Sequence, residues 1–263
     1  MLVANSIVPA ALTANYAAAV LADSPVGYWP LNEASGTVAL DASGNGHDGT
    51  YSGSFTLGAS GLLPASTNTC VNFTGGRMAV PDAVALRLGA GALSVEAWIN
   101  ASSMASYASL WDDGTSGATR GYSLFLNANG GGGPTRVYAE FGGSGDPSNE
   151  IAISTGIATN ETDHVVVTSN GLGAIVIYRN AVSVFSRPNQ VIGAANSANG
   201  VTLFGNPSGG GGLLQGKAQS FAVYGSVLTP ARVTAHYNAG VGSSPAAWLA
   251  PLVVAVSGRA ASV

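Results

Sequence analysis

Short runs of alternating apolar and polar residues, separated by clusters of Gly, Asn, Asp and Ser, repeat along most of the chain. The clearest run is Leu93–Ile99. It places Leu, Val, Ala and Ile on one face and Ser, Glu and Trp on the other, because successive side chains of a strand point to opposite sides. Short strands between turn signals are typical of a β-sandwich or barrel. The pattern therefore predicts an all-β protein.

The same pattern predicts where the strands lie. The expected strands are Gly27–Leu31, Cys70–Phe73, Met78–Val80, Leu93–Asn100, Ser109–Trp111, Gly121–Asn127, Arg136–Phe141, Glu150–Ser154, His164–Ser169, Ala174–Arg179, Val201–Phe204 and Lys217–Tyr224. One short helix is expected near residues 230–238, because Thr229 can cap it and Pro230 suits its first position. Gly240 is expected to end this helix. One domain is expected over residues 16–242, between apolar segments at 1–15 and 243–263.

Composition narrows the class of protein. Only 8% of the 263 residues are charged, 46% are hydrophobic and 37 are Gly, with a net charge of −4. Disorder is excluded because it requires low hydrophobicity and high charge. No basic stripe occurs, so a nucleic-acid partner is not expected, and no apolar run reaches the roughly 18 residues of a membrane span. Residues Met1–Val20 lack Lys and Arg, so no signal peptide is predicted.

Several segments match a known family in order. Tyr28–Glu33 reads Y-W-P-L-N-E, Asp41–Thr50 reads D-A-S-G-N-G-H-D-G-T, and the strands Leu93–Ile99, Thr162–Thr168 and Ile177–Asn180 follow. Together with Gly216–Tyr224 and the segment His236–Gly240, they resemble the laminin-G-like jelly-roll domains of the concanavalin A-like lectin/glucanase family. The resemblance covers residues 16–241 and implies an antiparallel two-sheet jelly-roll sandwich.

Three departures from that family pattern are visible. Asp163 stands where Trp is usual, and Ala181 replaces a turn Gly. The closing strand reads K-A-Q-S-F at Lys217–Phe221, without the acidic pair of the family. A calcium site of relatives that uses that acidic residue is therefore in doubt for this chain.

No enzyme is expected. Glycanases of this fold need two carboxylates close together, whereas Glu96 and Glu140 are each alone in their strands and Asp112 and Asp113 are adjacent. A degenerate glycanase remains as an alternative. His47, His164 and His236 show no zinc-binding spacing, so structural hydrogen bonds are expected of them. Cys70, the only cysteine, cannot form an intrachain disulfide and is expected to be buried.

Asp41, Asn45 and Asp48 lie in one Gly-rich loop. Carboxylate and carbonyl oxygens in such a loop can ligate calcium, and calcium is the only cofactor that the sequence suggests. The alternative is a plain turn, in which Asx side chains bond to their own backbone.

Two interpretations are open for the residues around a second Gly-rich loop, and the first is an aromatic platform for sugar. Its residues are Tyr107, Trp111, Asp112, Asp113 and Tyr122. The alternative is that Trp111 and Tyr122 are core residues, because aromatic side chains bury large areas.

The two ends of the chain predict protein partners. Leu2, Ile7 and Leu12 lie in one apolar arm, and Trp248, Leu249, Leu252 and Val254 lie in the other. Monomers rarely expose apolar surface of that extent, so a neighbouring subunit of a homo-oligomer or capsid is expected to cover it. The favoured hypothesis is a bacteriophage virion surface protein with weak binding to cell-surface glycan. The alternative is a secreted bacterial carbohydrate-binding or adhesion module.

Overall fold

The architecture comes from a computed structural model. It describes residues 15–88, 91–104, 108–113, 122–126, 136–141, 150–154, 156–188, 200–205 and 213–243. The elements, in chain order, are α1 (Tyr16–Leu21), β1 (Gly27–Trp29), β2 (Val38–Ala39), β3 (Gly49–Ala59), β4 (Cys70–Val80), the 3-10 turn η1 (Val84–Leu86), β5 (Leu93–Met104), β6 (Ala108–Asp112), β7 (Tyr122–Leu126), β8 (Arg136–Phe141), β9 (Glu150–Ser154), β10 (Asp163–Ser169), β11 (Ile175–Arg179), β12 (Val182–Arg187), β13 (Val201–Leu203), β14 (Leu214–Tyr224) and α2 (Pro230–Val241).

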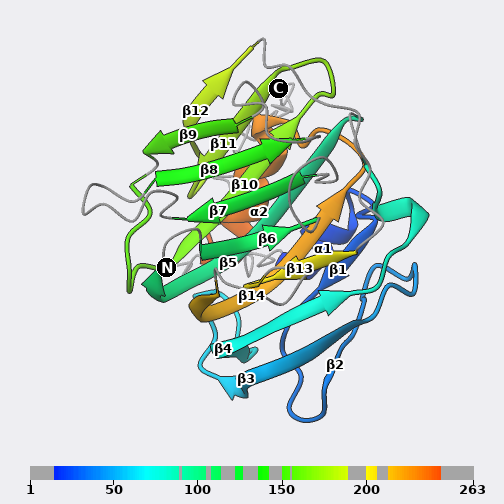
Figure 1. Cartoon of the computed structure of the whole chain (residues 1–263), viewed down its shortest axis with the longest axis vertical. Helices are drawn as coiled ribbons and strands as arrows, with labels where there is room; N and C mark the ends of the chain where they lie inside the picture. The colour runs from blue at the N-terminus through cyan, green and yellow to red at the C-terminus, as the bar shows by residue number, and fades with distance from the viewer. Residues whose placement is uncertain are drawn as a thin grey trace, which may run out of the picture.

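One continuous antiparallel sheet of 14 strands curls into the two layers of a jelly roll (Figure 1). Its hydrogen-bonded order is β12-β11-β10-β5-β14-β4-β13-β6-β7-β8-β9, with β1 added to β14 and β3 added to β4. The long strand β14 links the layers, because it pairs with β5, with β4 and with β1. The predicted fold class is therefore confirmed.

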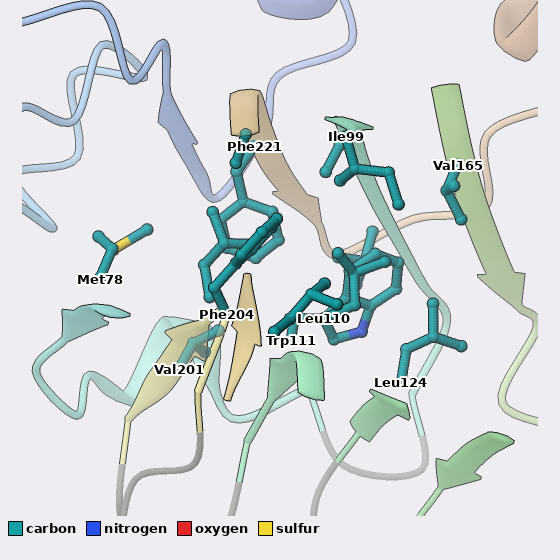
Figure 2. Close-up of a cluster of buried hydrophobic side chains, with 14 of the residues drawn as sticks. Met78, Ile99, Leu110, Trp111, Leu124, Val165, Val201, Phe204 and Phe221 are labelled. Carbon is teal, nitrogen blue, oxygen red and sulfur yellow. The ribbon is translucent and has the colours of Figure 1, made fainter. Parts of the chain in front are cut away.

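The main core fills the space between the two layers. Side chains from β5 and β10 meet side chains from β6 and β7 there, as Figure 2 shows for Ile99, Val165, Trp111 and Leu124. In β5 the odd-numbered residues, from Leu93 to Ile99, all belong to this core. The alternation in the sequence therefore predicted the inward face correctly.

A second apolar cluster covers the outer face of the sheet. Tyr16 and Val20 from α1 and Val233 from α2 pack with Trp98 on that face. Gly240 of α2 lies so close to this ring that an added Cβ would meet the Trp98 Cζ2 atom at 2.3 Å. The outer face of β5 is thus buried by helices rather than exposed to solvent.

The helices differ from the prediction in number and length. Thr229 caps α2 and Pro230 opens it as expected, but the helix continues past Gly240 and ends at Gly242, which adopts φ +77°. Helix α1 was not predicted. Its six residues are too few for a helical period to show, although Asn15 caps it by accepting a hydrogen bond from the Ala17 N–H at 3.0 Å. The helices in the described part of the chain are all too short or too polar to span a bilayer.

Three strands were also missed. β2, β3 and β12 lie at or near the margins of the sheet, where one face or both remain exposed. β3 is rich in Gly, Ser and Thr, and its residues show little apolar alternation. It is a strand because it pairs with β4 along most of its length.

Candidate functional site

A buried carboxylate lies at the centre of the outer face of the sheet. The Glu96 side chain is 0% exposed. It accepts hydrogen bonds from His164 Nε2 at 2.9 Å and from His236 Nδ1 at 3.1 Å, and a third from the Tyr224 hydroxyl. These partners come from β10, α2 and β14, so one side chain ties a helix to three strands.

His236 carries a positive charge in this cluster. Its Nδ1 atom faces the Glu96 carboxylate, and its Nε2 atom faces the Ala19 carbonyl at 3.0 Å and the Asp23 carboxylate at 2.8 Å. Both ring nitrogens therefore face atoms that can only accept, and only the imidazolium has two N–H donors. Burial acts to lower the pKa of His236, but the charges of Glu96 and Asp23 outweigh it and raise the pKa above its ordinary value.

The positive charge on His236 in turn lowers the pKa of Glu96. Burial acts to raise the pKa of this carboxyl, but the positive charge of His236 and the hydrogen bonds from both histidines outweigh burial. The pKa of Glu96 therefore lies well below its ordinary value. Glu96 and His164 are both fully buried, so this cluster is closed to a substrate and joins the helices to the sheet. Structural hydrogen bonding, expected of His164 and His236, is confirmed.

A polar pocket opens beside this cluster. It has a volume of about 360 Å³ and lies between the start of α1, β1, the loop after β3 and the bulge of β14. Its lining consists of amide, hydroxyl and small apolar groups: Asn15, Tyr16, Ala17, Tyr28, Pro30, Asn32, Leu63, Ala65, Ser66, Thr67, Asn68, Gln219, Ser220 and Ala239. Amide and hydroxyl groups can both donate and accept hydrogen bonds, so the pocket suits a polar, uncharged ligand.

The backbone is strained where β1 and β14 meet at this pocket. Leu31 has φ +57° and Ser220 has φ +58°, in the left-handed region that L-residues other than Gly, Asn and Asp rarely adopt. The Ser220 N–H bonds to the Pro30 carbonyl at 3.0 Å, and the Ser220 hydroxyl lies 3.4 Å from that of Tyr28. Strained residues cluster at binding sites because the surrounding structure must hold them there.

Gln219 holds the opposite wall of the pocket in place. Its Oε1 atom accepts hydrogen bonds from the backbone N–H groups of Leu62 and Leu63, at 2.6 and 3.3 Å. Gln219 is 2% exposed, so the loop that carries Ser66 and Asn68 is attached to β14 through a buried amide. The pocket is built from segments far apart in the sequence, and the sequence did not reveal it. The residues Y-W-P-L-N and Q-S were interpreted as strand and family pattern, not as parts of a pocket.

The predicted aromatic platform is not exposed. Trp111 is 2% exposed and Tyr122 is 0% exposed, and Figure 2 places Trp111 between Phe221 and Leu124 in the main core. Asp112 and Asp113 are buried too, at 0% and 2%. The core interpretation of the two rings is therefore confirmed. The expectation that they stack on a sugar is wrong, because the second layer of the sheet covers them. Tyr107 lies outside the described residues.

The predicted calcium loop is organised by its own hydrogen bonds. The Asp41 carboxylate accepts from the N–H groups of Tyr28 and Ser43 at 3.0 and 2.8 Å and from that of His47 at 2.9 Å. The Asn45 side chain donates its amide N–H groups to the Pro25 and Val26 carbonyls. Burial acts to raise the pKa of Asp41, but these hydrogen bonds outweigh it and lower the pKa.

Asp48 takes part in the same turn, because its Oδ1 atom accepts from the Asp41 N–H at 2.8 Å. Within the described ranges, no three His, Cys, Asp or Glu side chains are grouped to hold a metal ion. These contacts match the turn interpretation of the loop, because both Asp41 carboxylate oxygens accept backbone N–H groups. Calcium binding stays a prediction.

The predicted assembly residues lie outside the described part of the chain. This holds for Leu2, Ile7 and Leu12 at one end and for Trp248, Leu249, Leu252 and Val254 at the other. The division of the chain into an arm at residues 1–15, a domain at 16–242 and a tail at 243–263 also stays a prediction. Cys70 is 1% exposed, and burial raises the pKa of its thiol to about 11, so the expectation of a buried cysteine is confirmed.

Comparison with known proteins identifies a fold family. The family model described as the concanavalin A-like lectin/glucanases superfamily matches residues 72–234. No curated protein sequence matches the chain significantly.

Solved structures agree with the fold. Domain 4 of AbnA, a GH43 extracellular arabinanase from Geobacillus stearothermophilus solved in complex with arabinotriose, superposes with a TM-score of 0.59 at 20% identity, covering 81% of this chain and 98% of that one. Botulinum neurotoxin type C, whose cell entry is described as dependent on two ganglioside molecules, superposes with a TM-score of 0.59 at 16% identity, covering 82% and 51%. Trypanosoma rangeli sialidase in complex with sialic acid gives 0.57 at 15%, covering 81% and 32%. The chain thus corresponds to the whole arabinanase domain but to about half of the toxin chain and a third of the sialidase chain. At these identities the likeness establishes the fold.

Proposed function

The chain belongs to the concanavalin A-like lectin/glucanase superfamily, and on that premise we propose that it is a non-catalytic, glycan-binding jelly-roll module. The sugar binds in the polar pocket beside α1, between β1, the loop after β3 and the bulge of β14.

The chemistry of the pocket lining carries this proposal. Each sugar hydroxyl can donate one hydrogen bond and accept others, so it pairs well with amides and hydroxyls held in fixed positions. Asn32, Asn68 and Ser220 supply amide and hydroxyl groups from three separate segments. The volume of about 360 Å³ falls in the range of about 300–1,000 Å³ that is usual for small-ligand sites.

Neighbouring structures support binding as a function of this fold. The arabinanase domain that superposes on this chain is a domain of similar length and was solved with arabinotriose. Three of the described carboxylates are too enclosed to act on a substrate. Glu96 is closed off by its histidine partners, and Asp112 and Asp113 lie within the fold, whereas a glycosidase presents its two carboxyl groups to the substrate.

We place the module where it meets external glycans, on a bacteriophage virion or outside a bacterial cell. The virion hypothesis rests on the low charge of the chain and on the two apolar arms, and an extracellular location also agrees with the extracellular arabinanase among the neighbours. The arms supply the contacts with other subunits in either case.

The test compares two matched serine variants of the full chain. Ser220 lines the pocket with φ +58°, and Ser24 lies outside it with a similar φ of +51°. Glycine accepts both conformations, so each Ser→Gly change removes one hydroxyl without adding strain. Glycans found on an array are then titrated by calorimetry.

We expect Ser220→Gly to weaken sugar binding by about tenfold, because one hydrogen bond to a ligand contributes roughly 1.4 kcal/mol. Ser24→Gly is expected to bind like the wild-type chain. An array without any bound glycan would refute the function. Equal affinity of Ser220→Gly and wild type would refute the assignment to this pocket.

A further inference from the structure

The polar pocket is uncharged throughout. None of the described residues that line it carries an Asp, Glu, Lys, Arg or His side chain. Its polar groups are the hydroxyls and amides of Tyr16, Tyr28, Ser66, Thr67, Ser220, Asn15, Asn32, Asn68 and Gln219. Any ligand charge that enters the pocket therefore lacks a partner of opposite charge among these groups.

Two ionic groups on the strands around the pocket are engaged with other partners. The Glu96 charge is compensated by His236 beneath the helices, and the Lys217 ammonium donates to the Ser60 side chain at 2.9 Å and to its carbonyl at 3.3 Å. Burial raises the pKa of Tyr28 to about 12, so its hydroxyl keeps its proton and remains a neutral donor.

We propose that this pocket selects neutral sugars and rejects sugars that carry a carboxylate. This inference rests on the proposed glycan-binding function and specifies the class of ligand. A neutral sugar exchanges its bonds to water for bonds to amides and hydroxyls, which are of similar kind. A carboxylate would shed its water without gaining a cation, and an unpaired charge is costly in a partly enclosed site. The selectivity therefore comes from the hydration that the carboxylate loses when it enters the pocket.

Fold likeness alone would not predict this selectivity. The sialidase that superposes on this chain was solved with sialic acid, a sugar that carries a carboxylate. Recognition of such a group typically uses Arg, whose planar guanidinium pairs with both oxygens. The described lining of this pocket contains no Arg, so acidic sugars are not expected to be its ligands.

The experiment uses pairs of sugars that differ in charge on the same skeleton. The full chain is titrated with galacturonotriose and its neutral methyl ester, and with 3′-sialyllactose and its neutral methyl ester. In each pair that binds, we expect the neutral member to bind at least tenfold more tightly. The acidic member binding equally or more tightly would overturn the inference and leave the glycan-binding function standing. If neither member of any pair binds and the array is also empty, the proposed function itself fails.

A variant with an added positive charge tests whether the preference for neutral sugars arises in this pocket. Asn68 is an exposed residue of the pocket lining, whereas Leu172 is 88% exposed in the turn between β10 and β11 and does not line the pocket. Asn68→Lys adds a cation to the rim, and Leu172→Lys adds the same charge elsewhere. We expect Asn68→Lys to reduce the preference for the neutral member at least threefold and Leu172→Lys to leave it unchanged. The same change in both variants would show a general charge effect and overturn the assignment to this pocket.

Discussion

Replacing Glu96 with Gln tests the buried cluster that joins the helices to the sheet. The side chain keeps its shape, but the negative charge that faces His236 at 3.1 Å and His164 at 2.9 Å is lost. An amide also has only one acceptor oxygen, whereas the two carboxylate oxygens of Glu96 accept from both histidines and Tyr224. At least one buried donor must therefore lose its acceptor.

The expected cost follows from the burial of this pair. Glu96 and His236 are both 0% exposed, and removing one partner of a buried ion pair costs about 3–5 kcal/mol. The total stability of a domain is about 5–15 kcal/mol. We therefore expect Glu96→Gln to remain folded at room temperature but to unfold at a clearly lower urea concentration.

The cost also depends on pH. The pKa of His236 is raised in the folded state, so its contribution is complete below the ordinary histidine value of about 6.5 and disappears as the pH rises through the folded value. The pKa of Glu96 is lowered, so its contribution is present above about 4.3 and disappears as the pH falls through the folded value. The difference between wild type and variant should therefore be largest between about pH 4.5 and 6.5 and should shrink toward pH 9.

Urea unfolding followed by tryptophan fluorescence, at several pH values from 4.5 to 9, measures this difference. Glu161→Gln is the matched control, because Glu161 pairs with Arg179 but its side chain is 54% exposed. Exposed pairs contribute under about 1 kcal/mol. A cost below about 1 kcal/mol for Glu96→Gln at pH 6, or a cost that does not change up to pH 9, would refute the charged pair.

Three further predictions concern the turn, the loop and the tail. Ala181 stands where the family has Gly and adopts φ +65°, so Ala181→Gly should raise the free energy of unfolding by roughly 1 kcal/mol in urea, and a lower value would contradict the strain. EDTA should lower the melting temperature if Asp41 and Asp48 hold calcium, since metal loss destabilises the native state; an unchanged melting curve would support the turn. Deleting residues 243–263 should reduce the mass of the assembly in light scattering, and assembly like that of the full chain would refute the role of the tail.

Local patterns in the sequence determined the strands and the type of fold. The alternation in Leu93–Ile99 predicted the inward face of β5, and Thr229 and Pro230 predicted the start of α2. These signals are readable because they depend on neighbours along the chain, through the two-residue repeat of a strand and the capping of a helix. β3 was not predicted because its Gly, Ser and Thr residues show no such repeat. It is a strand because it pairs with β4.

The environment of each face was decided only by the tertiary structure. The sequence shows only that Glu96 is the lone acid of its strand. It is buried because His236, 140 residues away, lies over it on α2. The sequence left both a platform and a core position open for Trp111, and the curl of the sheet covers it. The polar pocket joins residues of α1, β1, a loop and β14 across more than 200 positions. Local periodicity specifies which side chains share a face, but the segment that covers a face is set by packing between distant parts of the chain.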